Sequence, residues 1–174
     1  HGNVSSSAEA DGDEVGVERE LTGWGRHART HAIERRGESL EAISAGAQLS
    51  RGLGRAMALA CAEAGADCIL LGRDAASLDG AASEIRNLSR QAFTIQADVS
   101  QPEACEAACH QALAEFGPMD ILINNAGGRR QNIATEEMPL EVWRELMDLN
   151  LTSTFLCTKL IGGAMVARGQ GGRI

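Results

Sequence analysis

The sequence predicts an α/β fold in which a parallel sheet carries helices on both faces. Short apolar runs recur at 67–71, 92–97 and 120–124, and segments of helical periodicity separate them. A glycine pair, Gly52 and Gly54, opens the first of these helices. Ligands of such sheets bind at the carboxyl ends of the strands. The residues that follow each strand are therefore the candidates for function.

The first 44 residues differ in composition from the rest of the chain. They hold nine acidic and five basic residues, with no sustained hydrophobic period. This composition is typical of disorder or of a loose appendage. We therefore divide the chain into an irregular, disordered segment, 1–44, and an α/β domain, 45–174.

The helices are expected from their apolar stripes. The first stripe consists of Leu53, Ala56, Met57, Ala60 and Cys61, and the second of Leu78, Ala81, Ala82, Ile85 and Leu88. Ser100 and Glu103 predict a capping box for the third helix, with Pro102 in its first turn. Helical periodicity resumes at about Pro139 and runs to about Arg168, and Asn150 is a candidate break within it.

Composition and charge argue against several classes of partner. The net charge of −8 would repel the phosphates of a nucleic acid. No apolar run approaches the roughly 20 residues of a membrane helix, so no membrane partner is expected. The odd number of cysteines, five, and the absence of an apolar signal core favour reduced thiols and a cytoplasmic location.

Cys105 and Cys109 lie one helical turn apart, with His110 beside them. They could pair as two metal ligands, but small core-facing residues on a helix explain the same spacing. The second interpretation is preferred, and the sequence predicts no metal site.

Polar and glycine residues follow each predicted strand. Gly52 and Gly54 would let backbone N–H groups approach a pyrophosphate at a helix N-terminus. Arg73 stands where dinucleotide folds place an acid for the ribose 2′-hydroxyl; an arginine there suits a 2′-phosphate, and Arg51 could join it. Both arginines could also be ordinary surface residues. Asp98 either caps a turn or accepts a hydrogen bond from an adenine amino group.

Four stretches together carry a resemblance to a known family. SRGLGRAMALACAEAGADCILLGRD, ADVS, DILINNAGG and DLNLTSTF, in this order and spacing, resemble the short-chain dehydrogenase/reductase family over about residues 50–174. The resemblance implies a Rossmann-like, doubly wound parallel sheet that binds NAD(H) or NADP(H).

The resemblance also implies residue roles. Gly52, Leu53 and Gly54 would lie at the pyrophosphate, and Arg51 and Arg73 would favour NADP(H), with NAD as the other option. Asp98 and Val99 would flank the adenine, and Asn125, Ala126 and Gly127 would border the nicotinamide ribose. Asn150 matches an asparagine that supports a catalytic proton relay in the family; its other interpretation is a helix-breaking cap.

The chain also departs from the family pattern. The catalytic tyrosine has no counterpart, because the chain contains no tyrosine. Ala47 and Gln48 stand where the glycine turn would begin with threonine and glycine. The stretch 40–46 is a poor first strand, and since that strand is central in the family, its neighbours would be left with unpaired edges. We therefore expect an incomplete sheet that lacks the later strands, in a truncated or mis-assembled product that is inactive by itself.

The primary hypothesis is the cofactor-binding half of an NADP(H)-preferring oxidoreductase that interconverts a small-molecule carbonyl and an alcohol. A second hypothesis is a non-catalytic nucleotide-binding or subunit-interaction module, in which the long helices 103–116 and 139–168 form a homo-oligomer interface. A methyltransferase that uses S-adenosylmethionine shares the strand, glycine turn and helix, but the NNAG stretch argues against it.

Overall fold

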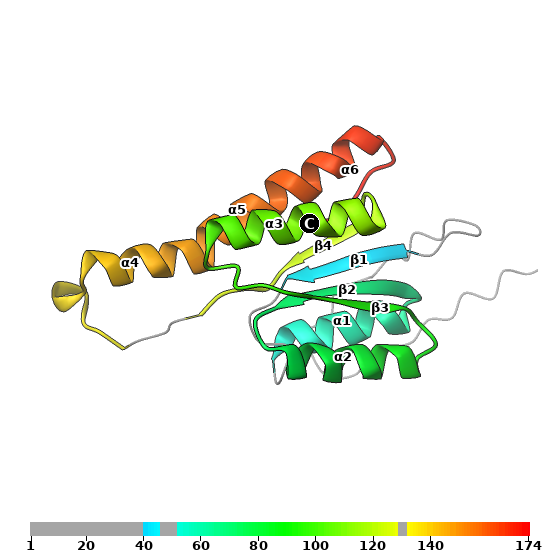
Figure 1. Ribbon diagram of the computed structural model, residues 1–174, viewed down its shortest axis with the longest axis horizontal. Helices are drawn as coiled ribbons and strands as arrows, with labels where there is room; N and C mark the ends of the chain where they lie inside the picture. The colour runs from blue at the N-terminus through cyan, green and yellow to red at the C-terminus, as the bar shows by residue number, and fades with distance from the viewer. Residues whose placement is uncertain (1–39, 46–51, 129–131) are drawn as a thin grey trace, which may run out of the picture. The chain divides into compact units, whose positions relative to one another are not determined.

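The computed structural model describes residues 40–45, 52–128 and 132–174. Within them, a four-stranded parallel sheet has the order β3-β2-β1-β4 (Figure 1). The strands are β1 (Leu40–Ala45), β2 (Ala66–Gly72), β3 (Ala92–Gln96) and β4 (Ile121–Asn124). The predicted α/β class and parallel sheet are confirmed. The predictions for 1–39 and for Arg51 lie outside the described residues.

Helices pack on both faces of this sheet, as expected for a doubly wound fold. α1 (Leu53–Glu63) and α2 (Ala75–Asn87) contact β1, β2 and β3 from one face. α3 (Pro102–Phe116) and the helical run that follows β4 pack together on the other face (Figure 1). A short 3₁₀ turn, η1 (Thr135–Glu137), precedes that run.

The first strand forms more fully than its sequence suggests. Leu40–Ala45 pairs with Ala66–Leu71 of β2 on one side, and Ala42–Ala45 pairs with β4 on the other. The expectation of unpaired neighbouring edges is therefore wrong. A central parallel strand gains its ladder from two partners, so weak intrinsic strand preference is overridden by its context. β1 also lies before the boundary placed at residue 45.

Strand β2 divides its side chains between two cores because successive residues point to opposite faces. Cys68 and Leu70 belong to the cluster under α1 and α2. Ile69 and Leu71 belong to the cluster under α3 and the last helices. Every residue of β2 except Asp67 is buried, which explains why it reads as a continuous apolar run.

The buried face of α1 is not the predicted stripe. Gly54, Ala58 and Ala62 are buried, whereas Leu53 is 75% exposed. Three small residues at a spacing of four let the helix backbone approach the sheet closely. Arg55 then joins α1 to α2 through an ion pair with Glu84. The stripe of α2 is as predicted up to Ile85, with Leu88 40% exposed.

The start of α3 also differs from prediction. Its N-cap is Gln101, without a side-chain capping bond. Ser100 does not cap the helix because its hydroxyl donates to Asp98 Oδ1 at 2.7 Å. The capping box is therefore wrong, while Pro102 does open the helix and Cys105, Ala108, Cys109 and Ala112 are buried as predicted.

The last helical run contains two π-helical segments. It comprises α4 (Leu140–Met147), η2 (Asp148–Thr152), α5 (Ser153–Cys157), η3 (Thr158–Gly162) and α6 (Gly163–Arg168), of which η2 and η3 are π-helical. Asn150 lies within η2, so the predicted break is a change of helix type. Buried residues recur at every fourth position: Leu149, Ser153, Cys157, Ile161 and Met165.

This spacing of four explains what the π segments do. An α-helix turns about 100° per residue, so each interval of four residues goes about 40° beyond a full turn. Over the four intervals from Leu149 to Met165, the stripe would rotate by about 160° around the helix. The wider π turns absorb that rotation. All five residues therefore stay on the side that faces α3 and the sheet.

The run Leu140–Arg168 is also long and apolar enough, by length and composition, to cross a membrane. Its best window has a mean hydropathy of 1.2 and is 33% buried in the fold. The sequence analysis expected no segment long and apolar enough to cross a membrane, and this run differs from that expectation. A core helix of a soluble protein passes the same test, and Leu149, Leu156 and Ile161 of this run belong to the core under the sheet.

The last described residues extend the sheet edge. Arg173 forms a parallel bridge with Ile121; its N–H donates to Asp120 O and its carbonyl accepts from Leu122 N–H, both at 2.9 Å. Arg168 secures this end, because its guanidinium lies 2.8 Å from Asp120 Oδ1 and donates to Pro118 O and Gly171 O.

Candidate functional site

The predicted site residues lie at one edge of the sheet. Gly52 follows β1, Arg73 follows β2, Asp98 follows β3 and Asn125 follows β4. Because all four strands are parallel, these positions share the carboxyl edge, where ligands of such sheets bind.

The N-terminus of α1 presents backbone N–H groups at this edge. Gly52 is the N-cap, with an extended backbone, and no side chain of the described residues caps the helix. The first turn also holds no acidic residue. Backbone N–H groups and the positive end of the helix dipole together favour an anion. Gly54 is buried against the fold, while the Leu53 side chain points into solvent.

Arg73 and Asp98 are neighbours in space. Arg73 Nη1 lies 3.7 Å from Asp98 Oδ2, and both side chains are partly exposed. Gln96 Nε2 donates to the carbonyl of Arg73 at 2.9 Å, which fixes the backbone there. The Arg73 guanidinium is thus available at the edge next to a single carboxylate.

Asp98 also orders its own turn. Its Oδ1 accepts from the backbone N–H of Ser100 at 3.0 Å and from the Ser100 hydroxyl at 2.7 Å. The turn-capping interpretation therefore holds, and Oδ2 is left facing Arg73. Val99 is 3% exposed and packs in the core, so only its backbone could border a ligand.

Asn150 holds the loop after β4. Its Oδ1 accepts from Gly128 N–H at 2.8 Å, and its Nδ2 donates to the carbonyls of Gly128 at 3.0 Å and Leu146 at 2.8 Å. A Cβ at Gly127 would lie 3.0 Å from Asn150 Oδ1, so glycine there permits the close approach. Gly128, which the sequence analysis did not single out, has a φ of 146° that favours glycine.

The rest of this loop is held by the core and by the last helical run. Ala126 packs against the core under α3, and Asn124 Nδ2 donates to Thr158 Oγ1 at 3.2 Å. Asn125 is half-buried between these anchored neighbours. The loop Asn125–Gly128 is therefore a fixed wall of the edge, held through side chains of the last helical run.

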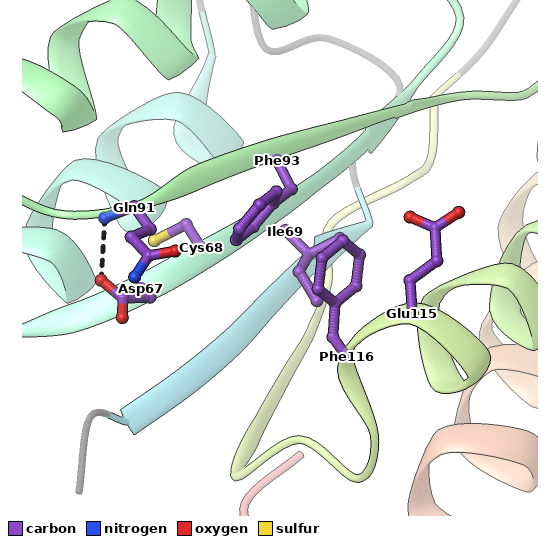
Figure 2. A pocket seen from close by; sticks show the side chains of 7 residues that line it. All are labelled: Asp67, Cys68, Ile69, Gln91, Phe93, Glu115 and Phe116. Carbon is purple, nitrogen blue, oxygen red and sulfur yellow. Dashed lines mark hydrogen bonds between the residues drawn. The ribbon is translucent and has the colours of Figure 1, made fainter.

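A separate pocket lies at the opposite, amino edge of the sheet (Figure 2). It has a volume of about 230 Å³ and is lined by Asp67, Cys68, Ile69, Gln91, Phe93, Glu115 and Phe116. The rings of Phe93 and Phe116 lie 4.5 Å apart, and Gln91 N–H donates to Asp67 Oδ1 at 2.8 Å (Figure 2). None of the predicted cofactor residues lines it.

The family model described as short chain dehydrogenase matches residues 43–174. The chain belongs to the short-chain dehydrogenase family. The match begins inside β1, a few residues earlier than the resemblance predicted from the sequence, and so includes the end of the first strand.

Individual members of the short-chain dehydrogenase family show the extent of the likeness. A 3-oxoacyl-(acyl-carrier-protein) reductase of Synechocystis is 34% identical over 123 residues, which is 70% of this chain and 49% of the relative. L-Sorbose reductase from Gluconobacter frateurii, solved with NADPH and L-sorbose, is 28% identical with a TM-score of 0.70, covering 78% of this chain and 51% of that one.

The cofactor differs among these structures. Carveol dehydrogenase from Mycobacterium avium, in complex with NAD, is 26% identical with a TM-score of 0.69, covering 79% of this chain and 53% of that one. This short-chain dehydrogenase chain spans about half the length of the curated relatives it matches. The two solved relatives carry different cofactors, so the likeness to them does not decide between NAD and NADP.

Proposed function

We propose that this chain supplies the NADP(H)-binding half of an oxidoreductase that interconverts a small-molecule carbonyl and an alcohol. The observation that carries the proposal is the N-terminus of α1, which no side chain of the described residues caps, at the same edge as Arg73. The helix end suits a pyrophosphate, and the guanidinium suits a 2′-phosphate. When bound, the nicotinamide would accept or supply the hydride.

The residues of the edge take distinct parts in this proposal. Gly52, Leu53 and Gly54 offer backbone to the pyrophosphate. Arg73, with Arg51, binds the 2′-phosphate. The backbone of Asp98 and Val99 borders the adenine, and the loop Asn125, Ala126 and Gly127 borders the nicotinamide ribose. Asn150 positions that loop through Gly128, so it supports the site and need not touch the substrate.

By itself, the 174-residue chain is proposed to have no turnover. The general acid of this chemistry is a tyrosine in the family, and the chain has none. Lys159 does not complete the tyrosine–lysine pair of the family, because Phe155 stands four residues earlier, where the tyrosine would be.

One experiment tests both parts. Purified chain is titrated with NADPH and NADH by fluorescence, and the same sample is assayed for NADPH consumption with simple ketones. We expect saturable binding that is tighter for NADPH, and no turnover. The absence of binding would contradict the cofactor proposal, and turnover above a heat-treated control would contradict the inactivity.

A second candidate function is a non-catalytic subunit-interaction module. It is favoured by exposed apolar side chains along the last helical run: Leu151 at 58%, Phe155 at 59% and Val166 at 82%. Exposed apolar side chains such as Leu151 and Phe155, one helical turn apart, are typical of an interface, and a homo-oligomer or a complex with an intact family member would cover them.

Association is tested by analytical ultracentrifugation of the chain and of Phe155→Glu. We expect a dimer or larger oligomer for the unmodified chain and a monomer for the variant. The reason is that a charge at position 155 would disfavour burial of these apolar side chains between subunits. A monomer for both would contradict this candidate. We also propose a location in the cytoplasm, without a membrane or nucleic-acid partner. The five cysteines are free thiols in the structure, and reduced thiols are typical of that compartment.

A further inference from the structure

Three cysteine thiols converge in the core between α3 and α5. Cys105 and Cys109 project from one side of α3, and Cys157 ends α5. The Sγ atom of Cys157 lies 3.7 Å from that of Cys105 and 3.7 Å from that of Cys109, and all three lie within 4.8 Å of one another. Their residues are 0%, 0% and 2% exposed.

These separations match a metal–thiolate triangle. With metal–sulfur bonds of about 2.3 Å, two sulfurs on one ion stand about 3.8–4.0 Å apart in tetrahedral or trigonal geometry. The two shorter separations in the cluster are within a few tenths of an ångström of that value. An ion could therefore be held with side-chain adjustments alone.

The donor set is made of sulfur only. Among the described residues, the group that could hold a metal ion here contains no histidine or carboxylate, and His110, next in sequence to Cys109, is exposed. The carbonyl of Ser153 lies 3.9 Å from Cys105 Sγ, but a carbonyl oxygen is a hard ligand that suits Mg²⁺, Ca²⁺ or Mn²⁺ rather than a soft ion. Structural zinc takes four ligands, whereas soft thiolates select Cu(I), which accepts three.

We propose that Cys105, Cys109 and Cys157 form a buried three-thiolate site for Cu(I). Binding forms copper–sulfur bonds as the thiols that become thiolates lose their protons to water, and copper remains Cu(I) throughout. The site lies outside the proposed cofactor site and does not depend on it.

The thiols are already arranged to share charge. Hydrogen bonds from Cys109 and Cys157 lower the pKa of Cys105, against the effect of burial. The same hydrogen bonds to Cys105 raise the pKa of Cys109 and of Cys157. A cation bound between the sulfurs would replace the thiol protons in a core that otherwise disfavours charge.

A bound ion would link two helices far apart in sequence. Cys105 and Cys157 are 52 positions apart, and the π segments η2 and η3 keep Cys157 turned towards α3. Because the fold brings the three thiols together, the ion should bind the folded chain more tightly than the unfolded chain and so stabilise the fold by mass action.

The test is a competition for Cu(I) between the reduced 174-residue chain and a chromophoric Cu(I) chelator, without oxygen. We expect one tightly held equivalent of copper per chain and a rise in melting temperature. Cys157→Ala should lose the bound equivalent and the rise. Cys68→Ala is the matched control, because Cys68 is also buried but lies in the other cluster, and it should retain both.

Circular dichroism establishes that each variant is folded. If Cys157→Ala does not fold, Cys105→Ala, on the other helix, replaces it with the same expectation. The proposal would be overturned if the unmodified chain held no copper, or if a folded variant of the cluster held copper as tightly as Cys68→Ala.

Discussion

Replacing Arg168 by alanine is expected to lower the free energy of unfolding by about 3 kcal/mol, the typical cost of removing one partner of a largely buried ion pair. The Arg168 and Asp120 side chains are 16% and 15% exposed, and their charged atoms lie 2.8 Å apart. The guanidinium also bonds two backbone carbonyls. Alanine removes this ion pair from the Asp120 carboxylate near the bridge between Arg173 and Ile121.

Urea denaturation followed by circular dichroism measures this effect. Arg168→Lys should recover part of the loss, because it keeps the charge but not the planar fork. Arg144→Ala is the matched control: Arg144 is 66% exposed, 4.0 Å from Glu141, and should change stability by about 0.5 kcal/mol or less. Equal losses for Arg168→Ala and Arg144→Ala would show that the ion pair does not stabilise the fold.

Replacing Arg73 by alanine is expected to weaken NADPH binding roughly 10- to 100-fold, while NADH binding changes little. A charge-assisted hydrogen bond contributes about 1.5–3 kcal/mol, and each 1.4 kcal/mol is tenfold in affinity. Only NADPH carries the 2′-phosphate. Removing Arg73 also leaves the Asp98 carboxylate, now 3.7 Å from the guanidinium, to repel that phosphate.

Fluorescence titration of both cofactors measures the change. The NADPH affinity of Arg73→Lys should lie between those of the unmodified chain and Arg73→Ala, since an ammonium binds phosphate without the planar fork of a guanidinium. Arg144→Ala again serves as the control. A parallel loss for NADPH and NADH would mean that the substitution damages the turn after β2 and that Arg73 does not select the cofactor.

Hydrophobic periodicity predicted where the helices lie in the sequence better than it predicted which of their residues are buried. The stripe beginning at Leu53 was selected because leucine and methionine are more hydrophobic than alanine and glycine. In the structure, the residues of α1 that pack against the sheet are instead the small ones, Gly54, Ala58 and Ala62. The capping box failed for a related reason, because Asp98 competes for the Ser100 hydroxyl, and a spacing rule does not include that competition.

The site was predictable where it is local in sequence. Residues that follow a strand can be identified from the strand alone, so Gly52, Arg73, Asp98 and Asn125 were expected at one edge, and the structure places them after their strands. Contacts across long separations could not be read in this way. The bonds of Asn150 to Gly128 span 22 positions, and Cys157 meets Cys109 across 48.

The strand order has a consequence for how the chain folds. Cys68 pairs with Ala92, 24 positions later, whereas Ala42 pairs with Ile121, 79 positions later. Closing the longer loop costs more chain entropy before any contact repays it. Because Leu40 pairs with Ala66 only 26 positions later, we expect β1, β2 and β3 to pair first and β4 to dock on β1 late. Until then the edges of β1 and β4 are open to other chains, so the yield of soluble protein depends on the speed of that last closure.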